Sequence, residues 1–171
     1  VNVSPRQFRD PGFGPLLWRA LAAEGLSPSL LKIEVTEDAL GEDADATTAF
    51  LHTLKSVGVK LALDDFGAGY SSLGRIHQLP LDAIKIDRSF VAGLGVDPHA
   101  RAIVRAVAGL AADLGLGLTA EGIETVAQVR ILREMGCTRG QGFLFSPAVP
   151  AEEAERLLVE GARPRLVSTA I

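Results

Sequence analysis

Strand-like and helix-like segments alternate along this 171-residue chain, and this alternation constrains its fold more than any other feature. The expected strands are segments 1–4, 30–37, 59–66, 82–87, 117–123 and 139–145. The expected helices are segments 46–57, 100–114, 125–135 and 151–160. Such alternation is typical of parallel βαβ units joined by right-handed crossovers. We therefore expect an α/β fold that forms one domain over residues 1–162, followed by a C-terminal tail at 163–171.

Side chains alternate between two faces along each expected strand, and the two faces differ in polarity. In segment 30–37, for example, Ile33 and Val35 share one face and Glu34 lies on the other. The same parity places one polar residue near the carboxyl end of every expected strand. These residues are Asn2, Glu34, Asp64, Lys85, Glu121 and Gln141.

Two α/β architectures can hold such units. A doubly wound open sheet has helices on both faces and gathers its ligand at one switch point. A barrel has a distinct inner face and takes catalytic residues from the carboxyl ends of many strands. The pattern here favours a TIM-like (β/α)8 barrel. About six of its eight units are present, and the first strands are expected upstream of Val1, which begins the chain inside a strand and without a methionine.

The chemistry of the polar face follows from its residue types. Carboxylates and amides offer the oxygen ligands that hard divalent cations take, and no His or Cys accompanies them. This set indicates Mg²⁺ or Mn²⁺, with two ions forming the clamp used in phosphodiester hydrolysis. A lysine among these acids, Lys85, is suited to orient or deprotonate an attacking water.

The stretch LALDDFGAGYSSL at 61–73 contains two adjacent acids, Asp64 and Asp65, and then a loop rich in glycine and serine. A protein kinase with this DFG would also carry a glycine-rich ATP loop and an HRD segment, and the sequence has neither. The loop lacks the Lys-Ser/Thr ending of a Walker motif. A cation site remains the best reason for keeping two repelling carboxylates together.

Charge and cysteine content narrow the class of protein. The net charge of −4 comes from interleaved acids and bases, which argues against binding to nucleic acid polymers or membrane surfaces. The single cysteine, Cys137, fits a reducing compartment and is expected to be a buried thiol. No apolar run is long enough to span a bilayer and no signal peptide is visible, so we expect a cytoplasmic segment, alone or attached to a membrane-anchored protein.

Six motifs carry a resemblance to a known family. VNVS, IEVTE, DDFGAGYSSL, LPLDAIKIDRSF, AEGIET and QGFLFSPAVP, in this order and spacing, resemble the EAL domain from Val1 to about residue 158. The resemblance implies a bacterial phosphodiesterase that hydrolyses cyclic di-GMP to linear pGpG in second-messenger signalling. It further implies a TIM-like barrel, Mg²⁺ or Mn²⁺ as cofactor, and a homodimer.

The resemblance also assigns roles to individual residues. Asn2, Glu34, Asp64, Asp65 and Glu121 match the metal ligands of the family. Lys85, Glu121, Asp65 and Gln141 match its catalytic positions. The residues that match the coupling of dimerisation to the site are Phe66, Gly67, Gly69, Tyr70, Ser71, Ser72 and the loop anchor Glu124.

One departure from the family is the Glu-Ala-Leu motif itself, which this sequence lacks. Its glutamate is a metal ligand in the family, so we expect the chain alone to be weakly active or inactive within a longer, competent parent protein that carries sensory or GGDEF-like domains. The main alternative is a degenerate module that binds cyclic di-GMP or a protein partner without hydrolysis. A metal-dependent barrel enzyme of another class, such as an enolase-like one, would not account for Asp64-Asp65 with the GYSSL loop.

Overall fold

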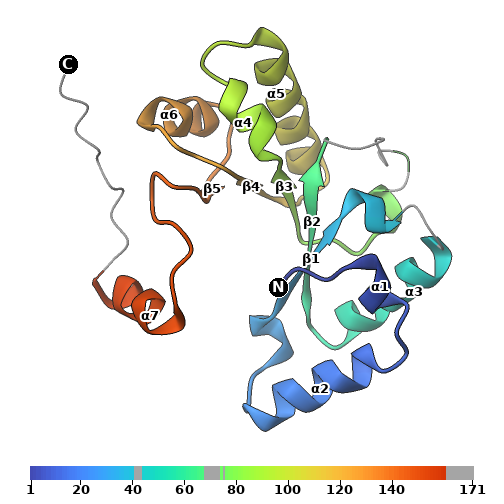
Figure 1. Ribbon diagram of the computed structural model, residues 1–171. Coiled ribbons are helices and arrows are strands. Elements are labelled where there is room, and N and C mark those ends of the chain that lie inside the picture. Colours follow the sequence, from blue (N-terminus) through green and yellow to red (C-terminus); the bar gives the residue numbers. More distant parts are fainter. Residues whose placement is uncertain (41–43, 68–73, 75, 161–171) are drawn as a thin grey trace. The chain divides into compact units, whose positions relative to one another are not determined.

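The computed structural model describes residues 1–40, 44–67, 74 and 76–160 (Figure 1). The strands are β1 (Lys32–Thr36), β2 (Lys60–Phe66), β3 (Ala83–Ile86), β4 (Gly117–Ala120) and β5 (Arg139–Gly140). The α-helices are α1 (Pro5–Phe8), α2 (Phe13–Ala23), α3 (Ala44–Ser56), α4 (Arg88–Gly93), α5 (Pro98–Asp113), α6 (Val126–Glu134) and α7 (Ala151–Glu160). Three short 3₁₀ helices are η1 (Pro28–Leu30), η2 (Glu37–Leu40) and η3 (Ile76–Gln78).

The five strands form one sheet in the order β1-β2-β3-β4-β5, which follows the order of the chain. β1 and β2 pair in parallel with Ile33 opposite Leu61 and Thr36 opposite Asp64, and β4 and β5 also pair in parallel. Along the chain, α3 lies between β1 and β2, α4 and α5 lie between β3 and β4, and α6 lies between β4 and β5, whereas the described residues between β2 and β3 form only η3 (Figure 1). The α/β class and the parallel sheet expected from the sequence are therefore confirmed.

The chain forms two compact units, of which the first comprises Val1–Lys85 and Gly109–Gly117. Its core lies where α3 packs on β2: Leu51 and Leu54 of the helix and Leu61 and Leu63 of the strand are completely buried. Burying one leucine side chain contributes about 2 kcal/mol, so these contacts fix β2 firmly. β2 in turn carries the acids Asp64 and Asp65 at its end.

The second unit comprises Ile86–Ala108 and Leu118–Ile171. Its buried side chains include Val91 of α4, Val104 of α5 and Leu132 of α6. Helix α6 begins at a capping box in which the Thr125 hydroxyl accepts from the Gln128 amide and the Gln128 side chain reaches back to the Thr125 amide. Among the described helices, none has the length and apolar character that a bilayer crossing requires.

The expected strand 1–4 is wrong as a strand. Only Asn2 forms a parallel bridge, to Glu34, with the Val3 amide donating to the Glu34 carbonyl at 3.1 Å. Ser4 then caps α1, and Pro5 occupies its first turn. The helix start signal of Ser-Pro therefore ends the extended segment after a single bridge.

The expected strand 139–145 is likewise too long, since β5 ends at Gly140. A Cβ on Gly140 would collide with the Ile123 side chain, and one on Gly142 with the Ile123 backbone. The chain turns at Gly142, with the Phe145 amide donating to the Gly142 carbonyl at 3.0 Å. The two glycines therefore permit a close backbone approach and a turn in place of a long strand.

Candidate functional site

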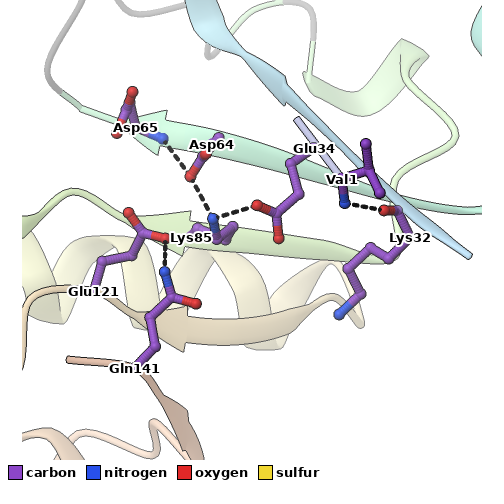
Figure 2. Close-up of polar contacts among 8 residues, drawn as sticks. All are labelled: Val1, Lys32, Glu34, Asp64, Asp65, Lys85, Glu121 and Gln141. Carbon is purple, nitrogen blue, oxygen red and sulfur yellow. Dashed lines mark hydrogen bonds and ion pairs between the residues drawn. The ribbon is translucent and has the colours of Figure 1, made fainter. Parts of the chain in front are cut away.

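Three charged side chains from three different strands meet in the first unit (Figure 2). The Lys85 Nζ atom lies 2.6 Å from Glu34 Oε2 and 2.9 Å from Asp64 Oδ1. Lys85 and Asp64 are only 4% and 7% exposed. The strand parity predicted from the sequence and the parallel pairing of the strands bring these three residues together.

This ion-paired group has an unequal charge balance. One ammonium faces two carboxylates, and burial makes each unpaired charge expensive. The pairs with Lys85 offset that cost for Glu34 and Asp64, yet the three groups together keep an excess of negative charge. A further cation would be attracted to this end of the sheet.

Asp65 follows Asp64 and differs from it in both conformation and burial. Its backbone φ is +53°, the one positive value among the described non-glycine residues. Aspartate tolerates this left-handed conformation better than most residues do. The Asp65 amide donates to Asp64 Oδ1 at 3.1 Å, and carboxylate oxygens of the two residues lie within 4.8 Å of each other. The bend thus keeps two carboxylates close enough to share an ion.

Asn2 is placed beside this group by its parallel bridge to Glu34. The Glu34 amide donates to the Val1 carbonyl at 2.9 Å, and the Val1 amino group donates to the Lys32 carbonyl at 2.7 Å. The first residues of the chain are therefore held along β1. Of the site residues expected in this unit, the structure brings Asn2, Glu34, Asp64, Asp65 and Lys85 to neighbouring positions on adjacent segments.

The second unit holds another expected pair, Glu121 and Gln141 (Figure 2). Gln141 Nε2 donates to Glu121 Oε1 at 2.7 Å. The backbones of their segments are joined as well, since the Gln141 amide donates to the Ala120 carbonyl at 2.9 Å and the Ile123 amide to the Gln141 carbonyl at 3.0 Å. Gln141 is thus fixed as the orienting partner of the Glu121 carboxylate.

Glu121 and Gln141 line a cavity of about 480 Å³, whose other walls carry polar and aromatic side chains. Among the lining residues are Arg88, Glu124, Phe143 and Ser146. Phe143 is 72% exposed, although a large aromatic side chain is costly to leave in water. A cavity with a cation, carboxylates, amides and an aromatic ring suits a polar ligand that carries flat rings.

Of the expected loop, Phe66 is buried and Gly67 adopts a φ of +95°. Gly69, Tyr70, Ser71 and Ser72 lie outside the described residues. The exposed Glu124 sits in the segment between β4 and α6, away from regular structure. Its anchoring role therefore stays a prediction.

Three further residues have structural roles that were not predicted from the sequence. Asp87 caps α4 by accepting from the Ser89 amide at 2.9 Å and from the Ser89 hydroxyl. Arg88 lines the cavity of the second unit. Gln128 is buried on α6; the Thr-x-x-Gln pattern at 125–128 was the available signal, because it is a capping box.

Cys137 is buried, as expected, and has no nucleophilic setting. Burial raises the pKa of its thiol, against the opposing effect of hydrogen bonding to backbone carbonyls, including that of Arg139 at 3.2 Å. A thiol of raised pKa carries little thiolate at neutral pH. Cys137 is accordingly a packing residue.

A family model described as the EAL domain matches residues 1–148. The chain belongs to the EAL domain family. Its structural relatives include the EAL domain of Mycobacterium smegmatis DcpA, which is 44% identical with a TM-score of 0.89 over 95% of this chain and 73% of that one. Such likeness also confirms the incomplete TIM-like barrel expected from the strand pattern.

Other relatives connect the family to a ligand. The structure titled PaMucR phosphodiesterase in complex with c-di-GMP is 43% identical with a TM-score of 0.86, over 90% of this chain and 62% of that one. Klebsiella pneumoniae BlrP1, in a complex with manganese and cyclic di-GMP, is 37% identical with a TM-score of 0.80, over 86% of this chain and 38% of that one.

Among curated relatives, the bifunctional diguanylate cyclase/cyclic di-GMP phosphodiesterase MucR of Pseudomonas aeruginosa is 43% identical over 90% of this chain and 22% of its own length. A signalling protein of Caulobacter vibrioides is 43% identical over 89% of this chain and 19% of its own length. The chain therefore spans about a fifth of the length of these relatives.

Proposed function

We propose that this chain is part of a divalent-metal-dependent phosphodiesterase that hydrolyses cyclic di-GMP to linear pGpG. The observation that carries the proposal is the buried Lys85 ammonium between the Glu34 and Asp64 carboxylates. A purely structural ion pair would need one acid, whereas the second acid and the neighbouring Asp65 supply negative charge in excess. The likeness to the PaMucR phosphodiesterase supports cyclic di-GMP as substrate.

The donor atoms of the site fit Mg²⁺ or Mn²⁺. Glu34, Asp64 and Asp65 offer carboxylate oxygens and Asn2 an amide oxygen, a set that hard cations prefer. We propose that these residues hold two ions, and the family resemblance implies the role of metal ligand for Glu121 as well. When bound, the ions would lower the pKa of a water molecule and neutralise charge on the phosphate.

The side chains of this chain would then act on water and on the substrate. Lys85 would donate a hydrogen bond to the attacking water or to the phosphate oxygens. Its ammonium has three protons, and one of them would exchange its bond to a carboxylate for a bond to water or phosphate. Gln141 would keep the Glu121 carboxylate in one orientation through its 2.7 Å hydrogen bond. In the reaction the water oxygen adds to phosphorus, one P–O3′ bond breaks, and the 3′ oxygen takes up a proton.

The same proposal includes the association that the family resemblance implies. A homodimer would form through the helix that follows the loop 66–73. That loop would couple dimerisation to the metal site, with Glu124 anchoring it. We also propose that the 171-residue chain by itself turns over slowly or not at all, because its sequence lacks the Glu-Ala-Leu motif and with it one acid of the family's metal site.

The test uses the full parent protein that contains this chain, its Asp64→Asn and Lys85→Ala variants, and cyclic di-GMP with Mg²⁺. Chromatography of the products is expected to show pGpG with the wild-type protein and a loss of at least 100-fold in rate with either variant. Tight binding of cyclic di-GMP without turnover in every form would instead support a receptor. Equal rates in all three proteins would remove Lys85 and Asp64 from the mechanism.

A further inference from the structure

Gln128 is a buried glutamine whose side chain bonds to two separate parts of the second unit. It is 9% exposed and occupies the third position of α6. Its Oε1 accepts from the amides of Glu124 and Thr125 at 2.8 and 2.9 Å, and its Nε2 donates to the Val91 carbonyl in α4 at 3.1 Å. A capping box needs only the bond to the Thr125 amide. The other two bonds require a further explanation.

One of the additional bonds, from the Glu124 amide, holds the segment 121–125, which joins β4 to α6 without regular structure, and the other ties Gln128 of α6 to the Val91 carbonyl of α4. The segment is also attached at two other points, because the Glu121 amide donates to the Ile86 carbonyl at 3.2 Å and the Ile123 amide to the Gln141 carbonyl at 3.0 Å. Gln128 supplies the third attachment, at the end that carries Glu124. Without it, the Glu124 amide would lose its acceptor, whereas Ile123 would stay attached through its amide and through its carbonyl, which accepts from the Leu144 amide at 3.0 Å.

The packing around the segment leaves little room for adjustment. Gly122 has a φ of +65°, and a Cβ there would lie 2.6 Å from the Arg88 Cβ at the start of α4. On the other side, Gly142 closes against the Ile123 backbone. Arg88 and Val91 belong to the same short helix, so the bond from Gln128 to Val91 holds α4 against the segment.

We propose that Gln128 is a positioning residue that fixes the conformation of the segment 121–125 and thereby the Glu121 carboxylate. In that conformation Glu121 accepts its 2.7 Å hydrogen bond from Gln141. The inference rests on the proposed function insofar as Glu121 is taken to hold a metal ion. Residues that orient a metal ligand in this way typically contribute about 10- to 100-fold to metal affinity or activity.

The test compares three variants of the full parent protein. Gln128→Met keeps the length of the side chain and removes all its hydrogen bonds, whereas Gln128→Glu keeps the two acceptor bonds and removes the donor to Val91. Thr125→Ala is the matched control, because it removes the other half of the same capping box, the bond from the Gln128 amide to the Thr125 hydroxyl, and leaves the three side-chain bonds of Gln128 in place. The measurements are the Kd for Mn²⁺ by calorimetry, the melting temperature, and amide hydrogen exchange.

We expect Gln128→Met to raise the Kd for Mn²⁺ about tenfold and to speed exchange at the amides of Glu121 and Ile123, which Gln128 does not touch. Gln128→Glu should recover part of the affinity. Thr125→Ala should lower the melting temperature while leaving the Kd and these two amides unchanged. A wild-type Kd in Gln128→Met, or equal effects of Thr125→Ala, would overturn the positioning role.

Hydrogen exchange also separates this inference from the proposed function, since it requires no catalysis. A wild-type protein that does not hydrolyse cyclic di-GMP would overturn the proposed function alone. Unchanged exchange at Glu121 and Ile123 in Gln128→Met would overturn the inference on Gln128 alone. If Gln128→Met does not fold, Gln128→Glu is compared with Thr125→Ala instead. The Kd for Mn²⁺ and the amide exchange at Glu121 and Ile123 then test the positioning role.

Discussion

At the scale of single residues, Lys85 holds a position that a metal ion would compete for. Its ammonium contacts the carboxylates of Glu34 and Asp64, which are also proposed metal ligands. The lysine therefore has two opposing effects on an incoming cation. It holds the acids in place through its ion pairs, and it repels a second positive charge.

Replacement of this lysine separates the two effects. We expect Lys85→Met to abolish turnover and to bind Mn²⁺ about tenfold more tightly, because the repulsion between two cations a few ångströms apart is removed. Without divalent ions the same variant should lose about 3 kcal/mol of unfolding free energy, since two acids are left without their partner. Calorimetric titration with Mn²⁺ and urea unfolding measure these quantities.

The control for this experiment is Lys32→Met, which removes a lysine from β1 outside the ion-paired group. It should leave the Kd for Mn²⁺ unchanged. Weaker binding of Mn²⁺ in Lys85→Met than in wild type would contradict the competition described here. In that case the lysine would act mainly by arranging the acids.

At the scale of elements, Asp82 joins the start of β3 to β2. Its carboxylate accepts from the Leu61 amide at 2.9 Å and pairs with Lys55 at 2.6 Å and Lys60 at 3.5 Å. Partial burial raises the pKa of Asp82, but the hydrogen bonds from Lys55 and Leu61 and the charges of both lysines outweigh this effect and lower the pKa below 3.8.

This lowered pKa makes the contribution of Asp82 dependent on pH. A group with a depressed folded-state pKa stabilises the protein fully above its unfolded pKa and loses that contribution as the pH falls through the folded value. Asp82→Asn should therefore cost about 0.5–1 kcal/mol near neutral pH and progressively less below about pH 4. Urea unfolding at several pH values tests this.

The exposed acid Glu155 on α7 provides a control, since Glu155→Gln should leave the same pH profile as wild type. A cost of Asp82→Asn that stays constant down to pH 2 would contradict the assignment of the effect to the charge of Asp82. The asparagine oxygen can keep the hydrogen bond from the Leu61 amide, so the variant isolates the charge.

The accuracy of the sequence-based expectations also differs between elements. Strand parity placed Glu34, Asp64 and Lys85 together because the period of two is a local property of any strand. It did not set the strand ends. The local helix start at Ser4 and Pro5 ends the first segment, and the close approach of Gly140 and Gly142 to Ile123, which is distant in sequence, ends the last. Helix α4 was not expected, since its six residues show no helical period.

The role of Gln128 was missed for a related reason. The capping box is visible in the residues Thr125 and Gln128, yet the bond to Val91 crosses 37 positions. No local sequence pattern predicts a hydrogen bond between residues so far apart along the chain. The positive φ of Asp65 was equally out of reach, because aspartate usually adopts ordinary strand geometry at such a position.

At the scale of the whole molecule, the chain combines acids and a lysine in the first unit with an oriented glutamate in the second. The acidic group of the first unit cannot attract a cyclic dinucleotide by itself, because the group and the phosphates of the dinucleotide are both negatively charged. Divalent ions bound by the acids would remove the repulsion between the acids and the phosphates. This is the central claim of the proposed function.

Turnover of cyclic di-GMP by the metal-stripped parent protein, measured as Mg²⁺ or Mn²⁺ is returned, tests that claim most directly. We predict no pGpG after chelation, saturable recovery with either ion, and no recovery in Asp64→Asn at the concentrations that restore the wild type. Ca²⁺ serves as a control for ionic strength and charge. Hydrolysis that persists in the stripped protein, or recovery that does not depend on Asp64, would contradict the claim.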